Sequence, residues 1–145
     1  MSRNVKTKTG ASLTVLAMQI QTKLFHWPEK GTHVIMIVRG PIGSGGLEWI
    51  FDEVASATRL LPDSKVLIDL LEATSKFAPI EIGVFVNSLK LDSWSHSPKI
   101  ALVSAQEIEQ YDQLATLSTC LSSRGLQVAV FYESKLAIDW LADKT

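Results

Sequence analysis

Glycine-rich segments between a strand and a helix can bind phosphate, and the sequence contains one such segment. Residues 40–46 read Gly-Pro-Ile-Gly-Ser-Gly-Gly, and Asp69 ends the next predicted strand, where dinucleotide-binding folds carry an acidic residue. The spacing is G-x-x-G-x-G-G rather than G-x-G-x-x-G, and the Lys-Ser/Thr pair of a P-loop is absent. We therefore interpret the segment as a connecting loop without nucleotide chemistry.

The remaining reactive residue types do not form a catalytic or metal-binding pattern. Asp69 could accept a phosphoryl group only with acidic partners for Mg²⁺, and the neighbouring predicted strands end in Arg39-Gly40 and Ser104-Ala105. The three histidines (His26, His33 and His96) are interpreted as surface residues, because a metal site needs more than two facing imidazoles. The single cysteine, Cys120, excludes an internal disulfide and has no histidine near it in sequence. The sequence predicts a protein that is not an enzyme, with no catalytic residues, metal or cofactor.

Composition and charge narrow the class of protein further. The chain has 145 residues, 46% of them hydrophobic and 20% charged, with a formal net charge of −1. This balance disfavours nucleic acid as a partner, because nucleic-acid binding normally requires a basic stripe. No apolar stretch approaches the roughly 20 residues of a membrane-spanning helix, so we expect a soluble, cytoplasmic protein. Residues 1–11 are expected to be a disordered arm, and residues 12–145 a single domain.

The hydrophobic pattern predicts alternating strands and helices after an N-terminal hairpin. Strands are expected at residues 13–27, 33–38, 65–70, 99–104 and 126–132. Helices are expected at residues 44–61, 79–94, 107–123 and 134–141. The core face of the third helix is expected to carry Tyr111, Leu114, Ser118 and Leu121. The order β-β-α-β-α-β-α-β-α predicts an α/β fold: a mixed five-stranded sheet, its first two strands antiparallel, and four helices.

The predicted helix at 79–94 is the main functional clue. At about 100° per residue, its apolar residues fall on two opposite sides. One face carries Ile82, Phe85, Val86 and Leu89, and the other carries Ile80, Val84, Leu91 and Trp94. A surface helix of a small domain needs one apolar stripe for its core. The second stripe indicates a partner chain, a lipid or an internal cavity, unless other elements cover both faces as ordinary core.

Trp49 is a second candidate for an interaction surface. On the predicted helix at 44–61 it projects about 180° from the core face, on the same outer stripe as Leu60. An aromatic side chain that faces water is a common anchor for association between proteins. The alternative is that Trp49 lies flat against a neighbouring loop.

Several stretches of the chain resemble the SpoIIAA-like group of the STAS superfamily. They are residues 66–69 (Val-Leu-Ile-Asp), residues 99–103 (Lys-Ile-Ala-Leu-Val), and residues 128–131 (Val-Ala-Val-Phe) followed by 137–141 (Ala-Ile-Asp-Trp-Leu). The resemblance covers about residues 12–142 and implies a non-enzymatic regulatory domain. In anti-sigma-factor antagonists of this superfamily, a serine at the start of the second helix is phosphorylated. This sequence has Phe-Ala-Pro-Ile at residues 77–80 in that place, so no hydroxyl is available for the switch.

The resemblance also indicates what the second apolar face binds. SpoIIAA-like proteins are similar to CRAL-TRIO lipid-binding domains, which implies an apolar or lipid-like ligand and peripheral contact with a membrane. Our leading hypothesis is therefore that the 79–94 helix binds an apolar ligand or a membrane surface, after moving away from the sheet. The alternative is a protein-interaction module that forms a homodimer or pairs with a regulatory partner through Trp49 and the same helix.

Overall fold

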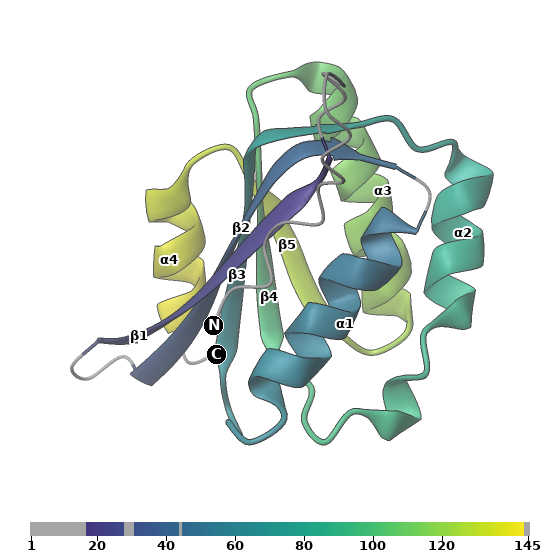
Figure 1. Cartoon of the computed structure of the whole chain (residues 1–145). Coiled ribbons are helices and arrows are strands. Elements are labelled where there is room, and N and C mark those ends of the chain that lie inside the picture. The colour runs from purple at the N-terminus through teal and green to yellow at the C-terminus, as the bar shows by residue number, and fades with distance from the viewer. Residues whose placement is uncertain (1–16, 28–30, 44, 144–145) are drawn as a thin grey trace, which may run out of the picture.

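A mixed sheet forms the centre of the structure, a computed structural model that describes residues 17–27, 31–43 and 45–143 (Figure 1). The strands are β1 (Gln19–Trp27), β2 (Gly31–Ile42), β3 (Lys65–Ser75), β4 (Lys99–Ser104) and β5 (Gln127–Phe131). They lie in the order β1-β2-β3-β4-β5. β1 pairs antiparallel with β2, and β2 to β5 pair in parallel. The predicted α/β fold with its N-terminal hairpin is confirmed.

Helices cover both faces of this sheet, but unequally. The helices are α1 (Gly46–Thr58), α2 (Pro79–Ser88), α3 (Ile108–Ser123) and α4 (Ser134–Ala142). Figure 1 shows α1, α2 and α3 on one side of the sheet and α4 on the other. In the same view α2 lies farther from the strands than α1 and α3 do. The layer of helices is therefore thicker on the side of α1, α2 and α3 than on the side of α4.

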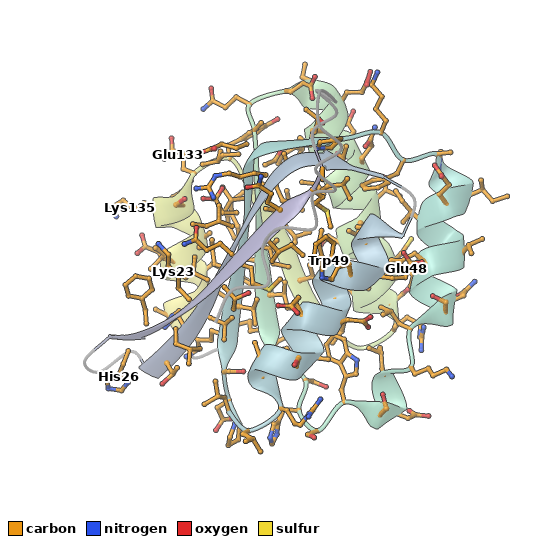
Figure 2. All side chains as sticks on the ribbon, in the orientation of Figure 1. Lys23, His26, Glu48, Trp49, Glu133 and Lys135 are labelled. Atoms are coloured by element: carbon orange, nitrogen blue, oxygen red, sulfur yellow. The ribbon has the colours of Figure 1, made fainter. Side chains whose placement is uncertain are left out.

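The unequal covering explains the burial pattern of the strands. On the central strand β3, Val66, Leu67 and Ile68 are all buried in succession, as expected where helices cover both faces of a sheet. The larger core lies under α1, α2 and α3, and a smaller cluster around Leu67 packs under α4. On β1 the burial alternates only at first, and from Lys23 to His26 the strand is exposed toward the turn of the hairpin (Figure 2).

Some expectations from the sequence about the fold are wrong, and others fall outside the described residues. The helix expected at 79–94 ends at Ser88, and a separate 3₁₀ turn, η1 (Leu91–Ser93), follows it. His33, expected at the surface, is fully buried on β2. The expected arm at 1–11 and the expected start of the first strand at 13–16 lie outside the described residues.

The early end of α2 has a local cause. Ser88 Oγ donates a hydrogen bond to the Phe85 carbonyl (2.7 Å), a type of side-chain bond that competes with continuation of the helix. Leu89 then adopts an extended conformation with φ −68° and ψ 130°. No helix in the described ranges is long and apolar enough to cross a bilayer.

Candidate functional site

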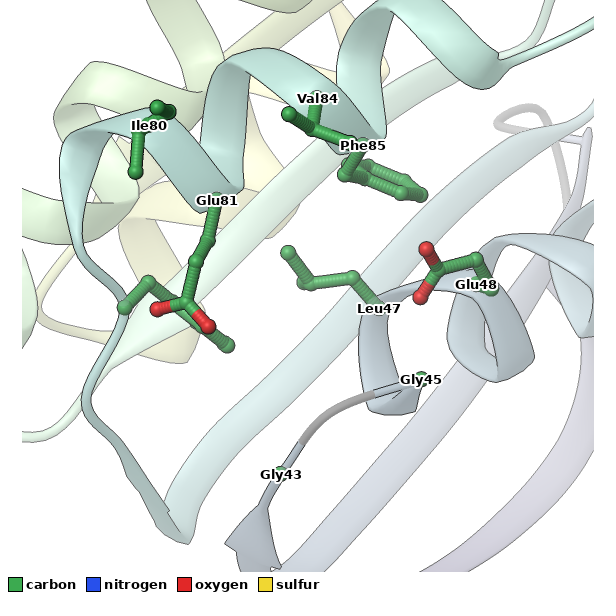
Figure 3. Close-up of a pocket in the computed structure, with 9 residues that line it drawn as sticks. Gly43, Gly45, Leu47, Glu48, Ile80, Glu81, Val84 and Phe85 are labelled. Carbon is green, nitrogen blue, oxygen red and sulfur yellow. The ribbon is translucent and has the colours of Figure 1, made fainter.

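An open cleft of about 360 Å³ lies between the first turns of α1 and α2 (Figure 3). Its apolar wall consists of Leu47, Phe77, Ile80, Val84 and Phe85. The carboxylates of Glu48 and Glu81 and the backbone at Gly43 and Gly45 complete the lining. The volume is at the lower end of the range for small-molecule pockets, about 300–1,000 Å³. We call this site the α1–α2 cleft.

The position of the cleft follows from the topology of the sheet. β2 and β3 are parallel neighbours, so their carboxyl ends meet at one edge. The chain passes from β2 into α1 and from β3 into α2 at this edge. The first turns of both helices therefore come close together outside this edge, on the same face of the sheet. Gly43 and Gly45 of the glycine-rich segment therefore border the cleft, although the spacing of these glycines does not predict a nucleotide site.

One face of α2 anchors the helix in the core. Ile82, Phe85 and Val86 are buried, and the Phe85 ring packs at 55° against the Phe51 ring of α1, with 5.3 Å between centroids. At the start of α2, the Glu81 carboxylate accepts a hydrogen bond from the Ala78 amide (2.7 Å). This bond satisfies a backbone donor that has no partner within the helix. The anchored face is therefore structural in this conformation.

The opposite face of α2 is exposed. Ile80 is 75% exposed and Val84 is 64% exposed, one turn apart on the helix and both beside the cleft. Figure 3 shows both side chains on the helix above Leu47 of α1. Large aliphatic side chains that are this exposed, and adjacent to an apolar wall, form a continuous surface available for contact. The second apolar stripe expected from the sequence exists, but it is shorter than predicted.

Polar contacts from α3 fix both ends of α2. Before the helix, the Phe77 amide donates to Gln113 Oε1 (3.1 Å). After the helix, the Arg124 guanidinium donates to the carbonyl of Leu89 (3.1 Å) and to the carbonyl of Val86. These carbonyls lie at or beyond the last helical turn, where helices leave acceptors without partners. α2 is thus held at its ends by α3 and in its middle by apolar packing.

The structure brings only part of the predicted site together. Ile80, Val84 and Phe85 line the cleft, whereas Ile82 and Val86 point into the core. Leu89, Leu91 and Trp94 are half-buried and pack against the larger core, because the chain leaves the helical path after Ser88. The cleft gives no support for a binding role of the other residues of the predicted set, and that role stays a prediction for Ile82, Val86, Leu89, Leu91 and Trp94.

Trp49 does not project into solvent as predicted. It is half-buried on α1 (Figure 2) and packs against the larger core, whereas Leu60 is 84% exposed. The expected common outer stripe of these two residues is therefore wrong. α1 ends at Thr58, so Leu60 lies beyond the helix that was expected to carry both side chains. A role for Trp49 in association stays a prediction.

Reasoning from the sequence missed the residues that α1 and the loops contribute to the cleft. Leu47, Glu48, Phe77 and Glu81 were not assigned a binding role, although each lies in the first turn of a helix or just before one. The signal that could have found them is the position of both helix starts directly after parallel neighbouring strands.

The charge of the cleft is negative. Each helix N-terminus contributes roughly half a positive charge, so the starts of α1 and α2 together supply about one. The lining contains two acidic residues, Glu48 and Glu81, and none of the lining residues is basic. The carboxylates therefore outweigh the two helix dipoles, and an anionic group gains nothing by entering the cleft.

Comparison with known proteins identifies the type of fold. No family model matches the sequence, and no curated protein matches it. A solved structure does match: an uncharacterized protein of the DUF3478 family from Shewanella loihica PV-4, described as having a SpoIIAA-like fold. The two chains are 16% identical, the match covers 91% of this chain and 99% of the other, and the TM-score is 0.54. This chain has a SpoIIAA-like fold. The SpoIIAA-like fold implied by the resemblance in the sequence is thereby confirmed.

Proposed function

We propose that this SpoIIAA-like domain is a binding protein whose α1–α2 cleft takes an apolar, lipid-like molecule with an uncharged or cationic end. The observation that carries the proposal is the exposure of Ile80 (75%) and Val84 (64%) beside an apolar wall. A ligand that covers these two side chains buries the apolar surface of α2 that the fold leaves exposed to solvent. No chemical step is required, in keeping with the non-enzymatic role that the sequence predicts.

The energy available from this contact supports reversible binding. Full burial of an aliphatic side chain contributes about 1.5–3 kcal/mol. Ile80 and Val84 are mostly exposed, so covering both would contribute on the order of 2–4 kcal/mol. Leu47 and Phe85 are 6% and 2% exposed and add little. Burial of the ligand's own alkyl chain adds about 0.8 kcal/mol for each CH₂ group that leaves water, and the loss of ligand freedom reduces the total. We expect dissociation constants between micromolar and millimolar for a simple alkyl chain.

The sequence does not distinguish among the possible apolar ligands, but the negative charge of the cleft favours some of them over others. Glu48 and Glu81 repel a fatty-acid carboxylate or the phosphate of an anionic lipid. The same repulsion disfavours docking of this face on an anionic membrane surface. A soluble amphiphile with a hydroxyl or ammonium group is therefore a better ligand than a bilayer.

A series of ten-carbon amphiphiles tests this proposal. Decanol, decylamine and decanoate share one chain and differ in the charge of the headgroup, and calorimetric titration measures the affinity of each. We expect decanol and decylamine to bind and decanoate to bind most weakly. Negligible binding of all three, or tightest binding of decanoate, would contradict the proposal.

Variants of exposed residues locate the binding without unfolding the protein. Val84→Asp places a charge on the proposed surface, and Leu60→Asp makes the same change at an exposed leucine outside the cleft. We expect Val84→Asp to weaken decanol binding by about fivefold or more, equivalent to about 1 kcal/mol of lost apolar contact. Leu60→Asp should leave the affinity unchanged. If Val84→Asp binds decanol as the wild type does, or if Val84→Asp instead abolishes a homodimer, the ligand proposal is wrong.

A further inference from the structure

A second crevice, separate from the α1–α2 cleft, lies at the carboxyl ends of β4 and β5. Its volume is about 550 Å³, within the range of small-molecule pockets. Ile108 and Tyr111 of α3, Tyr132 after β5, and Glu133 and Leu136 at the start of α4 form its walls. We call it the β4–β5 crevice.

The crevice exists because two successive helices leave the sheet in opposite directions. α3 follows β4 and α4 follows β5, and Figure 1 shows these helices on opposite faces of the sheet. Where neighbouring strands send their helices to opposite faces, the space outside the strand ends is not filled by the fold. This is the position at which open α/β sheets generally bind ligands.

Exposed aromatic and aliphatic side chains line the crevice beside Val130 and Phe131, which pack against the two buried clusters. The rings of Tyr111 and Tyr132 are stacked, with 4.4 Å between centroids and 17° between planes. Ile108 is 75% exposed and Leu136 is 52% exposed, and neither belongs to the two buried clusters. Two aliphatic walls beside a pair of aromatic rings fit a flat, apolar group.

The charge around the crevice is negative. Glu133 lines it and makes no side-chain capping hydrogen bond at the start of α4. Glu107 and Glu109 flank Ile108 at the start of α3. The two helix N-termini supply roughly one positive charge together, which the Glu133 carboxylate in the lining offsets. Glu107 and Glu109, which lie beside the lining rather than in it, make the surroundings negative. Lys135 lies close to Glu133 at the start of α4 (Figure 2), but its ammonium pairs with Asp139 (3.2 Å) and does not line the crevice.

We propose that the β4–β5 crevice is a binding site for an organic cation with a flat aromatic ring. The ring lies against the tyrosine pair between Ile108 and Leu136, and the ammonium group approaches Glu133. This proposal is independent of the α1–α2 cleft, since the two sites share no lining residue.

Three indole compounds test the proposal by differing only in charge. Tryptamine carries an ammonium group, tryptophol a hydroxyl group, and indole-3-acetate a carboxylate. Titration of each into the full ¹⁵N-labelled chain, followed by amide chemical shifts, gives both affinity and location. We expect tryptamine to bind most tightly and indole-3-acetate most weakly, with shifts concentrated at the start of α3 and from Tyr132 to Leu136. Shifts concentrated on α2 instead, or no shifts with tryptamine, would overturn the proposal.

Two pairs of variants separate the ring contact from the charge contact. Tyr132→Ala removes an exposed ring and should weaken tryptamine binding about tenfold, whereas Tyr132→Phe keeps the ring and should change it little. Glu133→Gln should remove the preference for tryptamine over tryptophol, which we expect to be about two- to fivefold at an exposed site. Glu48→Gln, at the other cleft, should leave that preference unchanged.

The outcomes that would refute the assignment are distinct. Equal affinity of Tyr132→Ala and wild type shows that the rings do not bind the probe. An unchanged preference in Glu133→Gln shows that the charge argument is wrong. Shifts at the crevice that depend on protein concentration without any probe show that a second copy of the chain occupies it, and the small-molecule proposal then fails.

Discussion

Arg124 fixes the end of α2 that carries the exposed apolar face, and its removal is the most informative perturbation of the fold around the cleft. The guanidinium at the end of α3 donates to the carbonyls of Val86 and Leu89. A positive charge near the C-terminus of a helix also interacts favourably with the helix dipole. Arg124→Met removes the charge and the donors but keeps a long apolar side chain.

The expected cost can be worked from these contacts. A hydrogen bond from a charged donor contributes about 1.5–3 kcal/mol, but Arg124 is exposed, so water replaces part of each bond. We therefore expect Arg124→Met to lower the free energy of unfolding by about 1–2 kcal/mol in total. For a domain of this size the melting temperature should fall by about 3–6 °C.

Urea denaturation measures the global change, and amide hydrogen exchange measures the local one. Arg59→Met is the matched control, because Arg59 is exposed at the end of α1 and, within the described chain, no side-chain hydrogen bond is found for it. Exchange should accelerate at the amides of α2 more than in β3 or β4, and the control should change neither measurement. Unchanged exchange in α2, or an equal loss of stability in Arg59→Met, would refute the assignment of Arg124 as the residue that holds this helix.

Two further substitutions test the framework that positions the clefts. Gln110 is 1% exposed, donates a hydrogen bond to the Ala73 carbonyl (2.9 Å) and accepts two further hydrogen bonds. Gln110→Leu should therefore lower the free energy of unfolding, measured by urea denaturation, by about 2–4 kcal/mol. A loss under about 0.5 kcal/mol would contradict the network. Gly40→Ala should cost more than Gly31→Ala in thermal denaturation. Both glycines have φ near +90°, but only at Gly40 would the new Cβ lie 2.8 Å from the Ala17 carbonyl oxygen; equal losses would contradict the close approach.

The sheet could be predicted from the sequence because its strands carry hydrophobic patterns typical of strands, alternating at the start of β1 and nearly continuous on β2. Ile20 and its polar neighbours gave the half-buried β1, and the β-branched run at 33–38 gave the buried β2. The pattern failed at His33, a polar residue that tertiary packing buries completely. It also failed at Tyr111, which was expected in the core and instead lies half-buried beside the β4–β5 crevice.

The candidate site could be predicted only in part, for a physical reason. Helical periodicity correctly placed Ile80 and Val84 on a second apolar face of α2. The same periodicity wrongly extended the helix to Trp94, because it contains no information on where the chain turns away to pack Leu91 and Trp94 against the core. The contribution of Glu48 depends on two helix starts meeting in space, which no local pattern contains.

Intermolecular nuclear Overhauser effects between decanol and methyl-labelled protein test the central claim most directly. We predict contacts from the alkyl protons to the methyl groups of Ile80 and Val84, and none to the methyl groups of Leu60, which is more exposed than either but lies outside the cleft. Absence of contacts to Ile80 and Val84, or contacts to these methyl groups from a second copy of the chain in place of decanol, would contradict the account.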